Sequence, residues 1–273
     1  IQAQNPALYI SLRNQFIPKM EYTYTYDNAS LRNVRNPIWW QTTFGSAGNL
    51  TSLIYKAFGQ SFSKEDKKLL GVPFAQFLKL NSEFRYHYRI DKNQMIASRI
   101  AGGVIWSYGN ATTAPYTEQF YIGGANSIRA YSARSIGPGG YPPDKEKKYS
   151  YINHVGDIRM EANVEYRFRI FKSFWGATFL DAGNVWLLRK DRKLLADGKE
   201  ARPNSQLRLK TFPKQIALGT GVGIRYDMDI LVFRLDFGIP LHLPYDTDRS
   251  GYYNVTGAFF KNLGIHFAIG YPF

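Results

Sequence analysis

The stretch RMEANVEYRFRI, residues 159–170, alternates between two kinds of side chain. One set is apolar or aromatic and comprises Met160, Ala162, Val164, Tyr166, Phe168 and Ile170; the other is polar or charged and comprises Arg159, Glu161, Asn163, Glu165, Arg167 and Arg169. Successive side chains of a β-strand point to opposite faces, whereas an α-helix repeats every 3.6 residues. The stretch therefore predicts a strand with one apolar face and one charged face.

The same alternation recurs along the chain. It is clear in EFRYHYRI (83–90) and in EYTYTYDN (21–28), where tyrosines alternate with threonines. Further candidate strands are residues 38–48, 95–109, 174–186, 215–227, 231–237 and 262–273, with 7–14 as a less regular one. Several of them reach the roughly 9–11 residues that a tilted membrane-crossing strand needs, whereas strands of soluble proteins average roughly 5–6.

Long strands with a continuous apolar face and a charged face predict an all-β fold, an antiparallel transmembrane β-barrel. Closure of the sheet leaves no unpaired backbone in lipid, and the charged face lines a wet lumen. Aromatic residues make up 16% of the chain, and five tryptophans near predicted strand ends suit the two membrane interfaces: Trp39, Trp40, Trp106, Trp175 and Trp186. The alternative, a large soluble antiparallel sheet with one solvated face, predicts shorter strands and fewer aromatic residues.

Composition and motifs argue against catalysis and against a metal site. The chain has no cysteine, which excludes disulfides and cysteine-based zinc sites, and its four histidines lack metal-ligand spacing. GTGVG (219–223) lies inside a period-two run with no following helix, which does not suit a phosphate-binding loop. We therefore expect no enzyme activity, no metal and no cofactor.

The net charge of +14 is compatible with nucleic acid, with anionic lipid or with a basic lumen. The arginines alternate along the strands and do not form the single patch that nucleic-acid binding requires, so no nucleic-acid partner is expected.

The connections between the predicted strands are unequal. Residues 59–73 and 190–210 are long, charged segments, whereas 88–96 implies a tight turn around Asp91, Lys92 and Asn93. Alternating long and short connections are typical of the extracellular and periplasmic rims of an outer-membrane barrel. The chain begins at Ile1, without an initiator methionine and without a signal-peptide pattern. We therefore expect a fragment or a processed product.

Four motifs in order carry a family resemblance. FYIGGANSIRAYSARSIGPGGY (120–141), GDIRMEANVEYRF (156–168), FLDAGNVW (179–186) and IHFAIGYPF (265–273) together resemble the C-terminal barrel of the BamA/TamA superfamily of outer-membrane assembly proteins, with wording closest to TamA-like members of Bacteroidetes. The resemblance covers residues 118–273, and residues 1–117 match only as generic barrel strands. It implies that the chain holds the C-terminal nine to ten strands of a sixteen-stranded barrel, with the remaining strands and periplasmic domains before Ile1.

The resemblance also implies a site. In the family a long loop, here about residues 121–157, folds back into the lumen and is held there by an arginine motif. Ile128 to Tyr131 occupy the motif's place, so Arg129 and Tyr131 are the candidate loop residues, with Glu165 and Asp181 as wall partners. Ala130 stands where glycine is commoner, and the expected bends of the loop are Gly123, Gly124, Gly137 and Gly139. Independently, Glu165 lies on the charged face of its strand, where a bidentate arginine contact gains most.

The last predicted strand resembles the C-terminal signal by which barrel proteins are recognised. Its candidate residues for a weak lateral seam are Gly264, Phe267, Gly270, Pro272 and Phe273. The implied function is assembly or insertion of proteins or other substrates through a laterally opening barrel, with outer-membrane lipid, unfolded outer-membrane proteins, accessory subunits and the rest of the barrel as partners. Two alternatives remain: a passive channel or two-partner secretion pore, and a soluble adhesin or lectin-like β domain.

Overall fold

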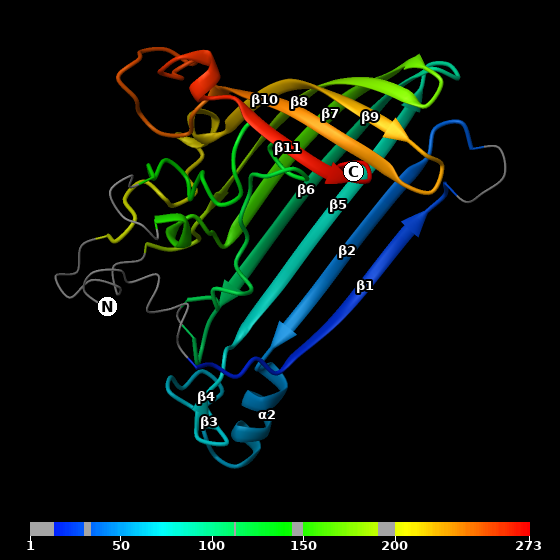
Figure 1. Cartoon of the computed structure of the whole chain (residues 1–273). Coiled ribbons are helices and arrows are strands. Elements are labelled where there is room, and N and C mark those ends of the chain that lie inside the picture. Colours follow the sequence, from blue (N-terminus) through cyan, green and yellow to red (C-terminus); the bar gives the residue numbers. More distant parts are fainter. Residues whose placement is uncertain (1–13, 30–33, 112, 144–149, 191–199) are drawn as a thin grey trace.

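A computed structural model describes residues 14–29, 34–111, 113–143, 150–190 and 200–273. Its main feature is one antiparallel sheet of nine strands in the order β1-β2-β5-β6-β7-β8-β9-β10-β11 (Figure 1). The strands are β1 Lys19–Asp27, β2 Ile38–Ala47, β5 Phe77–Arg89, β6 Gln94–Ser107, β7 Ile158–Phe171, β8 Phe174–Trp186, β9 Ala217–Asp227, β10 Val232–His242 and β11 Gly264–Ile269. Each of these nine strands pairs with the next of the nine along the chain, and β1 and β11 form the two edges of the described sheet.

The predicted strands match this sheet with three differences in extent. β5 begins at Phe77, whereas the prediction began at residue 83, because Ser82 interrupts the apolar alternation in the sequence. In the structure the Ser82 hydroxyl contacts Thr42 Oγ1 at 2.8 Å on the neighbouring strand. β10 continues past Phe237 to His242, and a register shift between Pro240 and His242 accommodates the proline. β11 is shorter than predicted, since it ends at Ile269. The candidate strand 7–14 falls almost wholly outside the described residues, and Asn14 is not in a strand.

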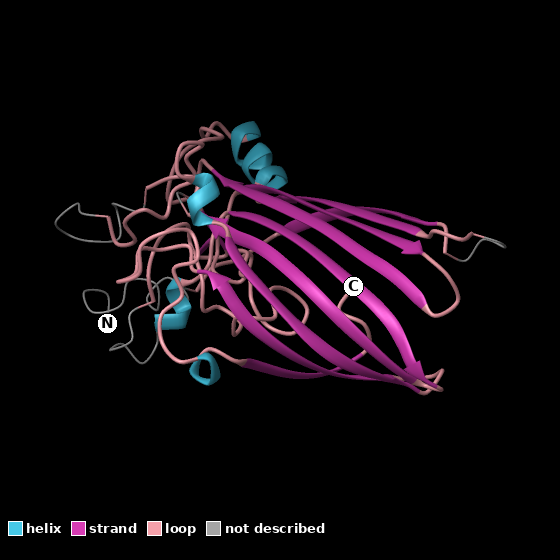
Figure 2. Ribbon diagram, turned by 90° about the horizontal axis from the view of Figure 1, so that it is seen from above, coloured by secondary structure: helices cyan, strands magenta, loops and turns pink. Residues whose placement is uncertain are grey.

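The connections alternate in length as predicted. Short ones link β5 to β6, β7 to β8 and β9 to β10, whereas long segments follow β2, β6, β8 and β10. The tight turn at residues 90–94 is closed by the Ile90 amide donating to the Gln94 carbonyl at 3.1 Å, and the Asn93 amide donates to Asp91 Oδ1 at 2.6 Å. In Figure 2 the strands sweep through the molecule as a curved layer, and most loops gather at one of its ends. The two ends of the strands therefore form a long-loop rim and a short-turn rim.

The polarity of the sheet is the reverse of that in a soluble protein. In β7 the charged side chains of Glu161, Glu165 and Arg167 are buried, whereas Val164 and Phe168 are exposed. The outward faces of β9 and β11 are likewise apolar and exposed, with Val222, Ile224, Ile265, Phe267 and Ile269. An apolar exterior and a charged interior are what a membrane barrel wall requires. No helix in the described part of the chain is long and apolar enough to cross a membrane.

The tryptophans divide between the two faces, which corrects the expected interfacial girdle. Trp40 and Trp106 are exposed, but Trp186 is fully buried and donates from Nε1 to Gln215 Oε1 at 2.9 Å. Trp39 lies against Arg85, and Trp175 against Arg169, with guanidinium carbons 4.2 and 4.9 Å from the ring centroids. Adjacent strand residues face opposite ways, so proximity to a strand end does not by itself place a ring in the interface.

Short helices and a small hairpin lie at the long-loop rim. The helix α2 (Asn49–Ala57) follows β2, and a two-stranded hairpin of β3 (Lys68–Leu69) and β4 (Val72–Pro73) follows α2. Single 3-10 turns occur at η1 Ser150–Asn153, η3 Phe212–Gln215 and η4 Phe259–Lys261. An apolar cluster joins the strand ends to the β6–β7 loop and includes Phe77, Ile105, Ile122, Ile128 and Val185.

Candidate functional site

The β6–β7 loop turns back against the inward face of the sheet. Gly123 and Gly124 adopt φ values of 91° and 92°, a conformation that favours glycine, and the Gly124 amide donates to the Tyr131 carbonyl at 2.7 Å. The Tyr131 amide in turn donates to Ile128 at 3.1 Å. This closed turn presents Arg129, whose side chain has no exposed surface.

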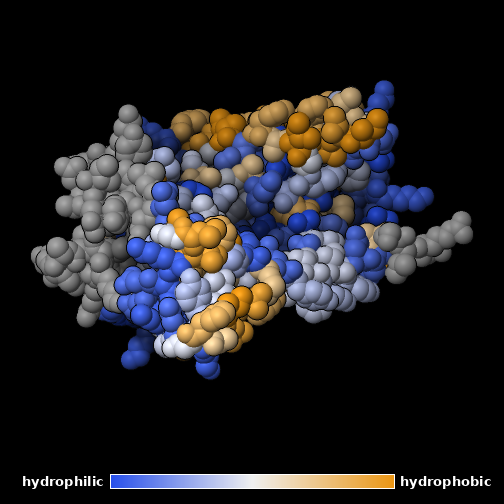
Figure 3. Space-filling view, turned by 90° about the horizontal axis from the view of Figure 1, so that it is seen from below, coloured by the Kyte–Doolittle hydropathy of each residue, from blue (hydrophilic) through white to orange (hydrophobic). Residues whose placement is uncertain are grey.

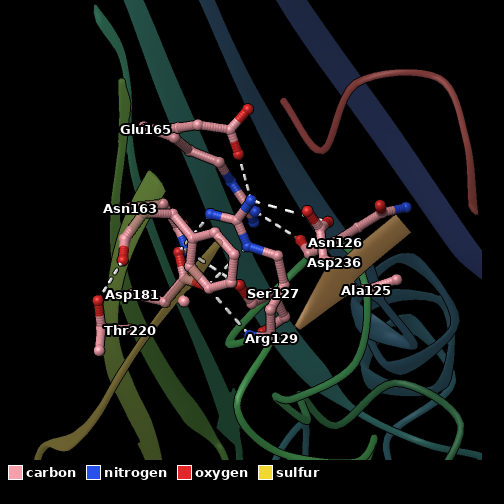
Figure 4. A network of polar contacts seen from close by, with 12 residues as sticks. Ala125, Asn126, Ser127, Arg129, Asn163, Glu165, Asp181, Thr220 and Asp236 are labelled. Atoms are coloured by element: carbon pink, nitrogen blue, oxygen red, sulfur yellow. Dashed lines mark hydrogen bonds and ion pairs between the residues drawn. The ribbon is translucent and has the colours of Figure 1, made fainter. Parts of the chain in front are cut away.

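Arg129 contacts both acidic residues named from the sequence (Figure 4). Its Nε and Nη2 donate to the two carboxylate oxygens of Asp181 at 2.9 Å each, and its backbone amide donates to Asp181 Oδ2 at 3.0 Å. Its Nη1 donates to Glu165 Oε2. The guanidinium carbon also lies 3.6 Å from the ring centroid of Phe179. The fork geometry and the ring contact use features that arginine has and lysine lacks.

Four further charged residues lie beside these three: Arg167, Arg225, Arg234 and Asp236. We call all seven the lumen network: Arg129, Glu165, Asp181, Arg167, Arg225, Arg234 and Asp236. Arg167 Nε donates to Glu165 Oε1 at 2.7 Å, and Arg225 Nη2 donates to Glu165 Oε2 at 3.0 Å. Asp236 lies 2.6 Å from Arg225 and 3.4 Å from Arg234. Four guanidinium groups thus share three carboxylates, and every member is at least nine-tenths buried.

The network keeps Arg129 charged. Burial alone would lower the pKa of Arg129, but the hydrogen bonds and charge of Asp181, with Glu165 and Asp236 nearby, raise it above its ordinary value. A buried charge with fixed partners can hold two segments together, and removal of one partner leaves the others buried and unpaired.

Polar residues around the network fix the loop backbone. Ser127 Oγ donates to Glu161 Oε2 at 2.7 Å, and Asn163 Nδ2 donates to the Ser127 carbonyl and to Asp181 Oδ1, both at 2.9 Å. Arg234 donates to the carbonyl of Ala125 at 3.0 Å. Asp236, Arg225 and Arg234 were not predicted from the sequence, although the charged face of GIRYD (223–227) and RLDF (234–237) carries the signal that would have indicated them.

Tyr131 anchors the loop at a second point. Its hydroxyl donates to the His242 carbonyl at 2.6 Å, and the Leu218 carbonyl lies 3.2 Å away. These carbonyls belong to β10 and β9. Burial raises the pKa of Tyr131, so the hydroxyl remains a donor. The loop is thus tied to β7 and β8 by Arg129 and to β9 and β10 by Tyr131.

Glycines on β9, β10 and β11 make room for the loop tip. A Cβ on Gly238 would lie 2.6 Å from the Arg129 carbonyl oxygen, and one on Gly219 would lie 2.3 Å from Ala130 Cβ. Gly264, which the sequence assigned to a weak seam, faces the same tip, with a Cβ position 3.1 Å from the Arg129 oxygen. Close approach of the loop tip is therefore a physical reason for all three glycines, by its backbone at Gly238 and Gly264 and by the Ala130 methyl group at Gly219.

The C-terminal residues do not continue the strand, which corrects the predicted strand to residue 273. β11 ends at Ile269, and Gly270 adopts a φ of 87°. Beyond it, Phe273 is buried, and its carbonyl accepts from Arg167 Nη2 at 3.2 Å. The positive φ turns the chain out of the ladder and into the lumen, so Pro272 and Phe273 lie outside the strand that was expected to contain them.

The far end of the loop is held by the other two predicted bends. Gly137 and Gly139 adopt φ values of 79° and 55°, and the Gly139 amide donates to the Val185 carbonyl at 2.6 Å. His154 Nδ1 contacts the Gly137 carbonyl. Among the described residues, no group of three or more histidine, aspartate or glutamate side chains is placed to hold a metal ion.

Comparison with known proteins places this geometry in a family. The Omp85 superfamily domain model matches residues 19–273. The chain is 37% identical over 111 residues to the outer membrane protein assembly factor BamA of Nitratidesulfovibrio vulgaris, which covers 39% of this chain. It is 30% identical over 89 residues to that of Neisseria meningitidis serogroup B, which covers 31% of this chain. The matched segments span only 13% and 11% of the length of these relatives.

Two solved structures share the fold. BamA from Haemophilus ducreyi lacking POTRA domains 1-3 superposes with a TM-score of 0.56 and 13% identity over 92% of this chain and 41% of that chain. CdiB from Escherichia coli superposes with a TM-score of 0.53 and 13% identity over 93% of this chain and 36% of that chain. The domain match and the two sequence relatives, together with the inverted polarity of the sheet, place the chain in the bacterial outer membrane. With a domain match over residues 19–273, the chain belongs to the Omp85 superfamily.

Proposed function

We propose that this chain is the C-terminal part of a barrel that assembles or inserts substrates, chiefly unfolded outer-membrane proteins, in the bacterial outer membrane. In this proposal the remaining strands of a sixteen-stranded barrel and the periplasmic domains precede the chain. The two curated relatives are named as outer-membrane protein assembly factors, which supports this reading. Accessory subunits and membership of a TamA-like Bacteroidetes group are part of the same proposal.

The observation that carries the proposal is the form of β11. Only six residues pair with β10, and Gly270 then bends the chain inward. The other edge of such a short strand presents backbone donors and acceptors to an incoming strand, as β-augmentation requires. A strand with few ladder hydrogen bonds can also leave its barrel partner at low cost.

The lumen network has a supporting role in this mechanism. Arg129 and Tyr131 hold the loop against β7, β8, β9 and β10, so these strands keep their arrangement while the seam beside β11 changes. We assign no covalent step to any of these residues. The loop is a brace for the barrel wall, and the seam is the moving part.

A two-partner secretion pore is the second candidate, because the CdiB barrel also shares the fold. In a pore the substrate would pass along the lumen, and the loop and Phe273 would have to leave the inward face. Assembly through the seam has no such requirement.

A reversible crosslink separates the two functions. Since the chain contains no cysteine, one can be introduced in β11 at Ile265 and another in the barrel strand that closes against it in the full-length protein. The expected result is loss of substrate assembly in proteoliposomes, recovered on reduction. A matched pair at Val164 and Leu180, which are register partners in β7 and β8, should leave assembly unchanged. Full assembly by the barrel crosslinked at the seam would refute lateral opening and favour the pore.

A further inference from the structure

The helix α2 turns its apolar stripe away from the protein. Leu50, Leu53, Ile54, Ala57 and Phe58 follow the spacing i, i+3, i+4, i+7 and i+8, which defines one face of a helix. All five are exposed, and Phe58 retains 83% of its surface. In a soluble protein such a stripe faces the core.

The polar face of α2 is the one that packs inward. Ser52 is fully buried and accepts from Lys67 Nζ at 2.9 Å. Asn49 donates to Ser46 Oγ at 2.9 Å and accepts from the Tyr108 hydroxyl at 2.7 Å, and the Tyr55 hydroxyl donates to the Lys68 carbonyl. These contacts fix the rotation of the helix, so the outward position of its apolar stripe is built into the fold.

The neighbouring β3–β4 hairpin also exposes an apolar side chain, in its turn. β3 and β4 are joined by the two residues Leu70 and Gly71, both with positive φ, at 52° and 82°. Such turns favour asparagine, aspartate or glycine, and leucine in this conformation is strained. Leu70 is nevertheless 92% exposed, so no contact within the described protein compensates for the strain.

The position of α2 matches the membrane interface. Trp106, an exposed tryptophan at the long-loop rim, pairs in register with Leu78, and Leu78 pairs with Ser46, three residues before the first residue of α2. Figure 1 shows α2 below the ends of β1 and β2, whereas the other long connections gather to the left. Figure 3 views the molecule from that lower side and shows hydrophobic patches beside hydrophilic surface. Exposed Lys56 and Lys68 flank the apolar residues, as in helices that lie in a headgroup layer.

We propose that α2 and the β3–β4 turn form an interfacial anchor outside the barrel wall, with Leu50, Leu53, Ile54, Phe58 and Leu70 inserted at the boundary between headgroups and acyl chains. The partner is lipid, because the stripe is apolar, lies just beyond the strand ends of a membrane barrel and is bordered by cationic side chains. The anchor does not depend on the proposed assembly function.

Site-directed spin labelling tests this directly. In the full-length protein, single cysteines at Ile54, Leu70 and Lys64 are labelled one at a time, and the barrel is reconstituted in phosphatidylethanolamine and phosphatidylglycerol vesicles. Frequent collision of the spin label with oxygen indicates that the label lies in lipid, and frequent collision with a water-soluble nickel complex indicates that it lies in water. Lys64 is the matched control, since it lies in the same segment, is exposed and is charged.

The expected result is an oxygen-to-nickel collision ratio several times higher at Ile54 and Leu70 than at Lys64. Leu70→Asn supplies a second readout, because asparagine suits the turn but not lipid: it should lower the ratio of a label at Ile54. A ratio at Ile54 and Leu70 equal to that at Lys64 would overturn the proposal in favour of a water-exposed surface. Labels that are immobile and shielded from both reagents would overturn it in favour of contact with another part of the protein.

Discussion

Strands β7 and β1 have the same alternating pattern in the sequence, but their environments differ. In β7 the inward residues from Glu161 to Arg167 are buried, whereas all nine residues of β1 are exposed. Two differences contribute: the β6–β7 loop covers the inward faces of the strands around β7 but contacts β1 at Lys19, near its start, and β1 is an edge strand of the described sheet. Alternation therefore determines which face a residue occupies, and the loop and the neighbouring strands determine whether that face is buried.

The chemistry of the inward faces follows the same division. Beside the loop, arginines and carboxylates form the lumen network, and each buried charge has opposite charges nearby. On β1 and β2, apart from the ion pairs of Lys19 at the start of β1, the inward contacts include those between small polar groups, such as the hydroxyls of Thr23 and Thr43 at 3.0 Å. Substitutions should therefore cost much more beneath the loop than at the β1 edge, and this comparison can be tested.

The largest effect is expected for Arg129→Ala. It leaves Glu165 and Asp181 buried without their shared partner, which should lower the free energy of unfolding by about 3–5 kcal/mol. Urea unfolding of the barrel in lipid vesicles, followed by tryptophan fluorescence, measures this. Arg134→Ala is the control, since Arg134 lies on the same loop and its side chain contacts Tyr116 and Tyr121 among the described residues, and it should cost about 1 kcal/mol or less. Equal losses for the two variants would contradict a special role for the network.

A charge on the lipid face should have the next largest effect. Val164→Arg places a charge on the exposed apolar face of β7 and should cost about 2–4 kcal/mol near the bilayer midplane. Thr25→Arg, on the inward side of β1, should change stability by less than about 0.5 kcal/mol because that side is open and polar. The same unfolding assay compares them, and a tolerated arginine at residue 164 would argue against lipid contact there.

A methyl group beneath the loop tip should have a smaller effect. In Gly238→Ala the new Cβ would lie 2.6 Å from the Arg129 carbonyl oxygen and 2.9 Å from the Ala130 nitrogen, both backbone atoms. We expect a loss of about 1–3 kcal/mol from overpacking. Gly102→Ala on β6 meets its nearest atom at 3.8 Å and should be neutral or slightly stabilising. If the two alanines had equal effects, close approach of the loop would not be the reason for glycine at residue 238.

The sequence predicted the parts of the molecule that depend on local periodicity. The strands and their two faces followed from alternating residues such as Val164 and Glu165. The alternation of connections followed from the lengths of the segments between the strands. The positions of Arg129, Glu165 and Asp181 in the site came from the order of family motifs. Asp236 and Arg225 carried the same period-two signal, but nothing local indicated that they would meet Glu165 in space.

Features that depend on tertiary contact could not be predicted. The bend at Gly270 looks like a strand glycine in the sequence, and its positive φ becomes apparent only with Phe273 packed in the lumen. Trp186 stands at a strand end like Trp106, yet Gln215 from a distant loop buries it. The helix α2 was itself not predicted, and even a recognised amphipathic stripe would not have revealed which side packs against the protein.

The smallest effect is expected where the loop segment does reach the β1 edge. Glu118 accepts from Lys19 Nζ at 2.8 Å at the start of β1, and from Lys79 Nζ at 2.9 Å on β5. Burial alone would raise the pKa of Glu118, but hydrogen bonds from Lys19 and Lys79 lower it below its ordinary value of 4.5. The link therefore stabilises the fold at neutral pH and is lost as the pH falls below about 4.5 and through the lowered pKa.

Glu118→Gln should accordingly cost about 1 kcal/mol or less at pH 7, because both lysines are partly exposed, and the deficit should vanish at a pH below the lowered pKa. Lys19→Met removes the contact of Glu118 with β1, together with the ion pair of Lys19 and Glu21 on β1 itself, so hydrogen exchange should accelerate at the β1 amides and not at those of β7. If Glu118→Gln increased hydrogen exchange in β7 as much as in β1, the loop would stabilise the whole sheet as one unit. The difference between the strands beneath the loop and the exposed strand β1 would then not hold. Faster exchange confined to β1 would instead identify Glu118 as the last contact through which the loop stabilises the sheet.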